Sequence, residues 1–376
     1  MDDLLERDEF RRSVFARDGH RCVICGAVGS GDPDHRDYSL DAHHIVERRL
    51  FTAPNQEGGY FSDNGATLCP THHRAAEQTV LSCEEIRERA DIRHVVLPEH
   101  LYEEFAYTKW GDIVQPNGTR LRGELFFDTS VQKILAEGGV LGLYAPYVKY
   151  PRTHHLPTSN PSKDDKVIES LRGFEGEEVV ATVKMDGEQT SMYRDHIHAR
   201  SLDLVMGADK GHVKAIHAAI AHEIPEGWRV CGENLYATHS LHYTWLDSYF
   251  YVFGIWNERN ECLSWDETVE WAELLGLRTV PVLYRGSWEA DRLLNLYKPL
   301  YNGEPTEGYV VRVTRRFAYG EFKRVVAKWV RPNHVTTANH WRHQKLVPNE
   351  LAVETLALRH RSSRGETNEG TLAVFQ

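Results

Sequence analysis

The stretch EVVATVKMDGE, residues 178–188, decides how this chain is interpreted. Its first seven residues are rich in β-branched side chains and predict a strand, and the Asp-Gly pair that follows predicts a turn. Taken alone, the Lys-x-Asp-Gly pattern at Lys184 is weak evidence, because a chain of this length contains it by chance roughly one time in ten. An ordinary strand end followed by a turn is the alternative until the neighbouring motifs are considered.

The segments around this stretch predict an alternation of strands and short helices. Strands are expected at 249–256, 308–313 and 324–330, helices at 82–90, 213–224 and 265–275, and an extended proline-rich loop at 151–162. Two of the helices begin with the serine and glutamate spacing of a capping box, at Ser82 with Glu85 and at Ser264 with Glu267.

Five further motifs follow Lys184 along the chain. They are Arg200-Ser201, GENLY at 232–236, YVFGI at 251–255, EGYVV at 307–311 and VAKWVR at 326–331. Their order resembles that of the covalent nucleotidyltransferase superfamily, which comprises RNA ligases, DNA ligases and capping enzymes. The phrases KYPRTHHLP, GENLYATHSLHY, EGYVVRV and VAKWVR are similar to those of a bacterial group of RNA ligases related to the nick-sealing phage type. The similarity covers about residues 148–348.

The resemblance implies an antiparallel-sheet nucleotidyltransferase domain, unrelated to the ATP-grasp fold, with an AMP pocket between its sheets. Lys184 would attack the α-phosphate of ATP and carry AMP as lysyl-AMP. A nearby cation, either Lys328 or a metal, would lower the pKa of Lys184 so that its amine is neutral when it attacks. The AMP would then pass to a 5′-phosphate end, which a 3′-hydroxyl attacks.

The same resemblance assigns roles to the other motif residues. Glu188 extends the lysine motif, Arg200 would hold the AMP phosphate or the 5′-phosphate end, Glu233 the ribose hydroxyls, Phe253 the adenine ring, Glu307 a Mg²⁺ or Mn²⁺ ion, and Lys328 the α-phosphate. Val326 departs from the pattern, because many nick-sealing ligases have a second lysine at that position. Each residue taken singly has a structural alternative, such as core packing for Phe253.

The length of chain after the last motif bears on the substrate. Fewer than 50 residues follow Lys328, which predicts no C-terminal OB-fold domain and favours an RNA ligase over a DNA ligase or a capping enzyme. The expected partner is nicked or broken RNA, or a duplex that contains RNA. Basic residues at 315–331 are expected to follow the backbone of such a duplex, although the whole chain has a net charge of −11.

A second constellation lies near the N-terminus. Cys22 with Cys25, and Cys69 with His72, have the spacing of two halves of a tetrahedral zinc site. In the cytoplasm, where we expect this protein to work, thiols stay reduced, so the clustered cysteines predict metal ligands rather than disulfides. We therefore expect Zn²⁺ to stabilise this module.

The residues around these ligands, Asp41-Ala42-His43-His44-Ile45, Asn64 and His73, resemble the HNH endonuclease family in its zinc-finger form, over roughly residues 10–90. The resemblance implies that His44 is the general base that activates water. It also implies that His43 and His73 bind a second, catalytic divalent metal, and that Asn64 orients the loop that carries the base. Two alternatives stay open: His72 and His73 exchange roles, or the module is a structural zinc finger that docks nucleic acid.

Composition and length complete the prediction. The 376 residues, 41% hydrophobic and 26% charged, indicate a folded chain of two or three domains. No apolar run is long enough to span a membrane, and no signal peptide is recognised, so we expect a cytoplasmic protein. The expected class is α+β: an HNH-like ββα-metal zinc module at 1–90, a connector or N-terminal elaboration of the ligase domain at 91–150, the nucleotidyltransferase domain at 151–335, and a short helical segment with a mobile tail at 336–376.

The predicted function is ATP-dependent sealing of RNA 3′-hydroxyl and 5′-phosphate ends, joined to an HNH module whose nuclease activity the sequence leaves undecided. Two other classes remain as alternatives. One is a binding protein for damaged nucleic acid that captures AMP or ends without sealing them. The other is an HNH nuclease with a regulatory nucleotide-binding domain.

Overall fold

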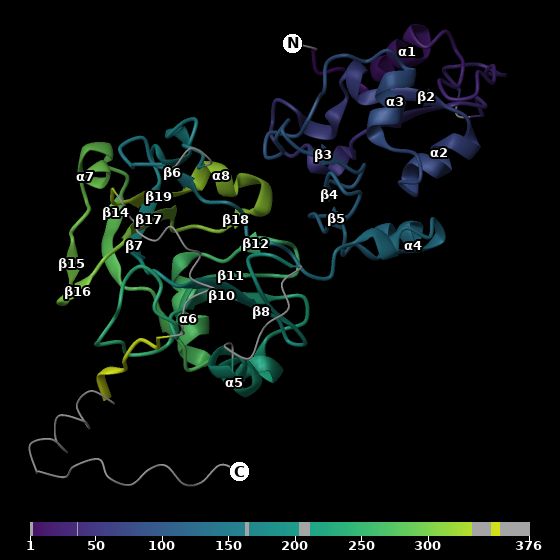
Figure 1. Cartoon of the computed structure of the whole chain (residues 1–376). Coiled ribbons are helices and arrows are strands. Elements are labelled where there is room, and N and C mark those ends of the chain that lie inside the picture. The colour runs from purple at the N-terminus through teal and green to yellow at the C-terminus, as the bar shows by residue number, and fades with distance from the viewer. Residues whose placement is uncertain (1–2, 36, 162–164, 203–210, 333–346, 354–376) are drawn as a thin grey trace, which may run out of the picture. The chain divides into compact units, whose positions relative to one another are not determined.

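The chain folds into two compact units, Met1–Val148 and Lys149–Gln376. The computed structural model describes residues 3–35, 37–161, 165–202, 211–332 and 347–353 (Figure 1). Helices and antiparallel sheets occur in both units, which confirms the expected α+β class. None of the described helices is long and apolar enough to cross a membrane.

The described helices are α1 (Arg7–Arg17), α2 (Pro70–Glu77), α3 (Cys83–Arg89), α4 (Thr129–Glu137), α5 (Gly211–Ile220), α6 (Trp265–Leu274), α7 (Ala290–Leu294) and α8 (Phe322–Val325). The described strands of the first unit are β1 (Asp41–His44), β2 (Gly65–Leu68), β3 (Ala106–Tyr107), β4 (Ile113–Val114) and β5 (Arg120–Leu121). Those of the second unit are β6 (His154–His155), β7 (Glu178–Lys184), β8 (Glu188–Met192), β9 (Ile197–Ala199), β10 (Arg229–Asn234), β11 (Phe250–Trp256), β12 (Glu261–Cys262), β13 (Arg278–Thr279), β14 (Val282–Ser287), β15 (Leu300–Tyr301), β16 (Glu304–Pro305), β17 (Gly308–Val313), β18 (Phe317–Ala318) and β19 (Val326–Val330).

The first unit contains a ββα arrangement, in which the antiparallel pair β1–β2 leads into α2. Cys69 is the N-cap residue of α2, and Pro70 occupies its first turn, where a missing backbone N–H costs no helical hydrogen bond. Phe15 of α1 and Ile86 of α3 pack with Leu68 in a common apolar core. Ser82 accepts a hydrogen bond from the Glu85 amide at the start of α3, as the spacing of these residues predicts.

The first unit extends well past residue 90, because residues 91–148 pack onto the ββα arrangement. The amide of Glu47 donates to the Lys109 carbonyl at 2.9 Å. The indole of Trp110 donates to the Glu77 carbonyl at 2.9 Å, at the end of α2. These bonds attach the β3–β4–β5 sheet to residues that lie far away in the sequence.

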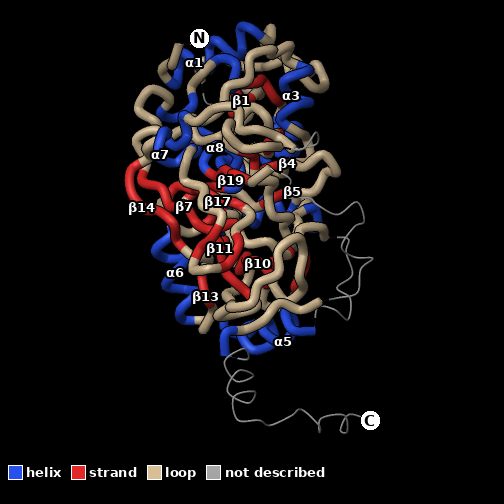
Figure 2. Tube along the Cα trace, turned by 60° about the vertical axis from the view of Figure 1, so that its left-hand side comes forward, coloured by secondary structure: helices blue, strands red, loops and turns tan. Residues whose placement is uncertain are grey.

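The second unit contains two large sheets, whose strands are red in Figure 2, besides the short pair β15–β16. Most neighbouring strands in the two large sheets are antiparallel. One sheet has the order β14–β7–β17–β19–β6, and the other has the order β18–β12–β11–β10–β8–β9, with β13 beside β11. Helices α5 and α6 share an apolar cluster with β10 and β11, including Val213, Val252 and Ala272, and thus cover one face of the second sheet.

The central strands of the first sheet have a fixed register that places the key lysine. In the β7–β17 pair, Lys184 lies opposite Gly308. A Cβ atom at Gly308 would lie 1.9 Å from the Trp329 carbonyl oxygen, so only glycine permits this close approach of β17 and β19. As a result, Glu307, which directly precedes β17, lies beside the end of β7.

Three predicted elements differ from the structure. Residues 324–330 were expected to form one strand, but Arg324 and Val325 complete α8, and β19 begins only at Val326. The expected loop at 151–162 contains the short strand β6. This strand pairs in parallel with β19 and forms the edge of the sheet. The helix expected at 213–224 ends as α5 at Ile220 and continues only as a 3-10 turn.

The segment 336–376 lies largely outside the described residues, except for 347–353. Within that short stretch, Asn349 is buried and its side-chain amide donates to the Leu235 carbonyl at 2.8 Å. Its side-chain oxygen accepts from the Tyr243 amide at 2.9 Å. Residues 347–353 therefore pack against the loop that follows β10.

Candidate active site and metal centres

Strands of both sheets in the second unit line a cavity of about 710 Å³. Six of the predicted nucleotide-binding residues contribute to its wall: Lys184, Glu188, Arg200, Glu233, Phe253 and Lys328. They come from β7, β8, the end of β9, β10, β11 and β19, so the tertiary fold gathers residues that are spread over 145 positions. A cavity of this size holds a nucleotide.

Lys184 ends β7, and its ammonium donates a hydrogen bond to the carboxylate of Glu307. Burial alone would lower the pKa of Lys184, but the negative charges of Glu307, Glu233 and Asp186 together raise it. From the sequence motifs, a neighbouring cation was expected to lower the pKa of Lys184. In this structure the carboxylates dominate instead, because Lys184 faces three of them and has an ion pair with one.

Asp186 anchors the turn that follows Lys184. One of its carboxylate oxygens accepts hydrogen bonds from the Ser240 amide at 2.8 Å, the Ser240 hydroxyl at 2.7 Å and the Leu241 amide at 2.7 Å. The amide of Asp186 donates to the Tyr243 hydroxyl at 3.0 Å. These bonds hold the Lys-x-Asp-Gly turn in one conformation, and the loop after β10 supplies all the partners.

Glu233 and Phe253 lie on the neighbouring strands of the second sheet. Glu233 accepts from the Gly187 amide at 3.1 Å, and burial raises the pKa of its carboxyl to about 8, against the opposing effect of Lys184. Phe253 is half-buried, its ring lies edge-on to Tyr150 at 5.1 Å, and part of it faces the cavity. An aromatic ring in this position is suited to stacking on a base.

A cationic group of side chains lies at another part of the same wall. Lys328 and Arg152 flank the carboxylate of Asp165, at 3.8 Å and 3.6 Å from the same oxygen. Burial and the charge of Lys184 both lower the pKa of Lys328. Arg200 lies at the cavity wall and is exposed. Together these cations are suited to binding phosphate groups.

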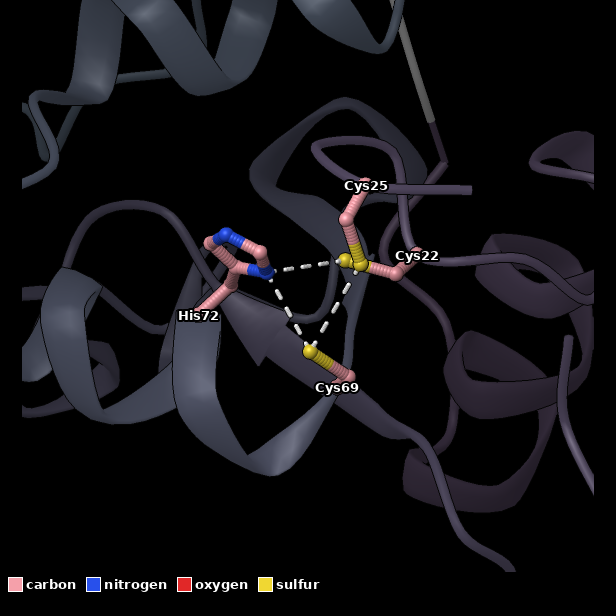
Figure 3. A group of neighbouring side chains, drawn as sticks. All are labelled: Cys22, Cys25, Cys69 and His72. Carbon is pink, nitrogen blue, oxygen red and sulfur yellow. Dashed lines mark hydrogen bonds between the residues drawn. The ribbon is translucent and has the colours of Figure 1, made fainter. Parts of the chain in front are cut away.

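In the first unit, Cys22, Cys25, Cys69 and His72 converge as predicted (Figure 3). The sulfurs of Cys25 and Cys69 are 3.9 Å apart, and the Nδ1 atom of His72 lies 3.6 Å from the Cys22 sulfur. A tetrahedral Zn²⁺ with Zn–S distances of about 2.3 Å separates two sulfurs by about 3.8 Å and a sulfur from a nitrogen by about 3.6 Å. The four ligands thus fit Zn²⁺, and His72 rather than His73 completes the set.

His43, His73 and Glu77 form a second group with metal-ligand chemistry. Oε1 of Glu77 lies 3.3 Å from Nε2 of His73 and 3.5 Å from Nδ1 of His43. Within the described residues, neither ring nitrogen of His43 makes a hydrogen bond, although the side chain is buried. Buried polar atoms normally have partners, so these orphaned nitrogens fit a metal ion.

The two histidines of this group differ in charge. Burial, with the nearby charge of Lys109, lowers the pKa of His43 well below its usual value, so its ring is neutral and can bind a cation. Nδ1 of His73 contacts the Asp41 carboxylate at 3.0 Å. The bonds to Asp41 and Glu77 raise the pKa of His73 to about 9, and Asp41 orients the ring so that Nε2 faces the group.

His44 lies on the opposite face of β1 from His43, because side chains alternate along a strand. Its ring stacks on Phe10 with centroids 4.5 Å apart, and burial lowers the pKa of His44 to about 3. The buried amide of Asn64 bridges the loop after His44: its oxygen accepts from the Val46 amide at 2.9 Å and its nitrogen donates to the Val46 carbonyl at 3.1 Å. Asn64 thus holds the chain that carries both histidines.

Comparisons with known families agree with this geometry. The family model described as RNA ligase matches residues 177–330, and the family model described as HNH endonuclease matches residues 22–82. The chain joins an HNH domain to an RNA ligase domain. This confirms the expected resemblance to RNA ligases and to HNH endonucleases. No curated protein matches the chain significantly.

Solved ligase structures resemble the chain only distantly. A Naegleria gruberi RNA ligase variant with ATP and Mn has 18% identity and a TM-score of 0.32, with 50% of this chain and 62% of that chain covered. A second variant of the same ligase with ATP and Mn has 16% identity and a TM-score of 0.36, with 74% of each chain covered. An archaeal ATP-dependent RNA ligase has 14% identity and a TM-score of 0.33, with 49% of this chain and 48% of that chain covered. The chain thus spans only part of the length of these ligases.

The structure adds residues that the sequence did not single out. In the HNH domain, Glu77 lies four residues after His73, on the same face of α2, and this helical spacing was the signal available. In the second unit, Tyr150 and Arg152 precede the RNA ligase match, line the cavity and belong to the KYPRTHHLP phrase. Asp165 also lines it, but no motif marked this residue.

The basic residues expected to follow a duplex are partly engaged elsewhere. Arg315 pairs with Glu177 at 2.9 Å and with Glu321, and Arg316 pairs with Glu267. Their charges are therefore largely compensated by acidic neighbours. Of this basic segment, Lys328 is the residue that reaches the cavity of the RNA ligase domain.

Proposed function

We propose that the RNA ligase domain seals RNA ends with ATP through covalent AMP on Lys184. The single observation that carries this proposal is the position of Lys184, whose amine ends a strand inside a cavity that also presents Glu188, Arg200, Glu233, Phe253 and Lys328. The match to the RNA ligase family supports the same activity. A nucleotide would stack on Phe253, place its ribose at Glu233 and direct its phosphates toward Lys328 and Arg200.

Three phosphoryl transfers make up the proposed reaction. The neutral Lys184 amine attacks the α-phosphorus of ATP, a P–N bond forms, and pyrophosphate leaves. An oxygen of the RNA 5′-phosphate then attacks the same phosphorus, the P–N bond breaks, and the lysine nitrogen is released for protonation. Finally the 3′-hydroxyl attacks the 5′-phosphate, loses its proton and expels AMP. Positioning and charge neutralisation carry these steps.

The Lys184–Glu307 ion pair has a direct consequence for the first step. A protonated amine has no lone pair with which to attack, so Lys184 must lose both its proton and its hold on Glu307. The carboxylate oxygens of Glu307 suit Mg²⁺ or Mn²⁺. Either ion, bound there, would neutralise the negative charge of Glu307 and so lower the pKa of Lys184. Lys328, next to Lys184, would add to the same effect and then hold the α-phosphate.

Labelling with ATP tests this proposal. Protein incubated with Mg²⁺ and α-labelled ATP should retain covalent label, and protein incubated with γ-labelled ATP should retain none. Added pyrophosphate should discharge the label. A protein that binds damaged nucleic acid without sealing it, the first alternative function, would keep no covalent label from either nucleotide.

The choice between RNA and DNA requires a second experiment. Nicked duplexes with all four combinations of ribose and deoxyribose at the 3′-hydroxyl and 5′-phosphate strands should be sealed at different rates. A ribose at the 3′-hydroxyl end should give the fastest sealing. Equal rates on the all-DNA nick would contradict the proposed substrate and leave the AMP transfer intact.

The HNH domain supports a second activity, metal-dependent cleavage of a phosphodiester. The observation that favours it is the group of buried His43 with half-buried His73 and Glu77, whose ring nitrogens and carboxylate suit a divalent cation. His44, neutral at physiological pH, would accept a proton from the attacking water, and Asn64 would hold its loop. Zn²⁺ at the four-ligand site would stabilise the domain and take no part in the reaction.

Cleavage of supercoiled plasmid and of RNA with Mg²⁺, Mn²⁺ or Ni²⁺ tests the second activity. Cleavage without covalent AMP would favour the other alternative function, a nuclease with a regulatory nucleotide-binding domain. Absence of cleavage with every metal, together with weaker binding to nicks after deletion of residues 1–90, would identify the domain as a docking finger.

A further inference from the structure

We infer that Lys109, which lies outside the residues matched by the HNH family, is a built-in counter-cation of the second metal site and weakens the binding of the divalent ion there. The inference rests on the proposed metal site of His43, His73 and Glu77. Lys109 precedes β4 and belongs to the segment 91–148, which packs onto the HNH match at 22–82.

The contacts of Lys109 bring its positive charge next to the proposed metal ligands. Its ammonium lies 3.2 Å from Oε1 of Glu77. This is the same oxygen that lies 3.3 Å from His73 and 3.5 Å from His43. The ammonium also donates to the main-chain carbonyl of His44 at 2.8 Å and lies 3.4 Å from Glu47. Lys109 therefore contacts a ligand carboxylate and the backbone of the candidate base at once.

Burial makes these contacts strong. The side chain of Lys109 is only 4% exposed, and a buried ammonium is retained only where carboxylates and carbonyls compensate its charge. In return, Lys109 compensates Glu77 and Glu47, two carboxylates that would otherwise repel each other when no divalent ion is bound. The HNH domain can therefore fold around Zn²⁺ alone, without its second metal.

The same charge opposes the divalent ion. A cation bound at Oε1 of Glu77 would share that oxygen with the Lys109 ammonium and would be repelled by it in this partly buried site. The second metal should consequently bind weakly. Whether the site of His43, His73 and Glu77 is occupied should then depend on the concentration of the free divalent ion. Removal of the positive charge should tighten Mn²⁺ binding by about tenfold or more, since close charges in a partly buried site interact strongly.

Binding of Mn²⁺ to the full-length, zinc-loaded protein tests the inference. Lys109→Gln removes the charge and keeps an N–H donor for the His44 carbonyl, whereas Lys109→Arg keeps the charge. Lys133→Gln makes the same charge change on an exposed position of α4. We expect Lys109→Gln to bind Mn²⁺ at least tenfold more tightly than wild type, and Lys109→Arg and Lys133→Gln to remain within about twofold of it.

Thermal unfolding with and without Mn²⁺ gives a second readout. Lys109→Gln should lower the Tm of the HNH domain without Mn²⁺, and saturating Mn²⁺ should raise it by more than in wild type, because the ion replaces the lost charge. Unchanged or weaker Mn²⁺ binding by Lys109→Gln with zinc retained would overturn the inference. A variant that stays unfolded at saturating Mn²⁺ would overturn it as well.

Cleavage assays separate this inference from the proposed nuclease activity. Tighter Mn²⁺ binding by Lys109→Gln, in a protein that cuts no nucleic acid, would support the role of Lys109 and contradict the nuclease. Glu77→Gln should abolish the tightening, because it removes the oxygen that lysine and metal share. Tightening that persists in the Glu77→Gln, Lys109→Gln double variant would place the Mn²⁺ elsewhere and overturn the inference.

Discussion

Each of the two compact units pairs a lysine with a carboxylate that we propose as a metal ligand, but the more exposed member of the pair is the lysine in one unit and the carboxylate in the other. In the RNA ligase domain, the Lys184 side chain is 24% exposed and its partner Glu307 is 8% exposed. In the first unit, the side chain of Lys109, which lies outside the HNH match, is 4% exposed, and its partner Glu77 is 24% exposed. The accessible member differs, and the chemistry that each pair can perform differs with it.

Access explains this difference in function. A lysine can act as a nucleophile only if an electrophile reaches its nitrogen, and Lys184 meets this condition at the cavity wall. Lys109 cannot meet it, because main chain and carboxylates enclose its ammonium. The accessible group in the HNH domain is the carboxylate, which suits the binding of a metal from solution.

The sharpest test of the comparison is removal of each lysine in turn. Lys184→Ala should abolish labelling by α-labelled ATP, since loss of a nucleophile lowers the rate by on the order of 10⁶ in well-studied enzymes. Lys109→Gln should leave labelling unchanged, and so should Lys214→Ala, an exposed lysine of α5. Full labelling of the Lys184→Ala protein would show that Lys184 is not the nucleophile that carries AMP.

Loss of zinc should have the next largest effect, and only on the HNH domain. Cys22→Ser should reduce bound zinc from about one ion per chain to none and unfold the HNH domain, because structural zinc contributes about 10 kcal/mol or more to folding in small domains. Metal analysis and thermal unfolding measure both changes. Cys83→Ala, which changes a buried cysteine of the first unit outside the cluster, should retain zinc. Zinc-free wild-type protein, purified without chelator, would contradict the site.

His44→Ala should separate the two activities. Metal-dependent cleavage should fall by about 10²–10⁴-fold, the usual contribution of a positioned general base, while zinc content and Lys184 labelling stay at wild-type levels. Rates of plasmid cleavage, metal analysis and ATP labelling on the same preparation give the three values. Undiminished cleavage by His44→Ala would show that another residue is the general base.

The smallest expected effect is the pH dependence that Glu233 gives to the stability of the RNA ligase domain. Its carboxyl has a pKa raised from 4.5 to about 8 by burial, so the folded state binds the proton more tightly than the unfolded state does. This contribution is fully present below about pH 4.5 and is lost as the pH rises to about 8. Denaturant unfolding without nucleotide or metal should show stability falling over that range, and Glu233→Gln should flatten the fall. An equal slope in both proteins would refute the shift.

Local sequence patterns predicted the strand at 178–184 and the helix start at Ser264 correctly, because both depend on near neighbours. The division of 324–330 between α8 and β19 was missed, since a run of β-branched residues does not show where a helix ends. Glu77 and Asp165 were missed for a different reason. An acidic side chain becomes a site residue only if other site residues lie next to it in space. Those neighbours are known only from the tertiary structure.

The sequence by itself determined the two domain families and most of the side chains of the two candidate sites. Residue types, their spacing and the order of the motifs are properties of the sequence alone. It did not determine the charge state of Lys184, which three carboxylates from separate segments set. Nor did it indicate Lys109, whose partners lie 32, 62 and 65 positions away. Contacts over such separations arise only when the sheets and helices pack. The tertiary structure therefore decided which lysine is within reach of a substrate and which is enclosed as a counter-charge.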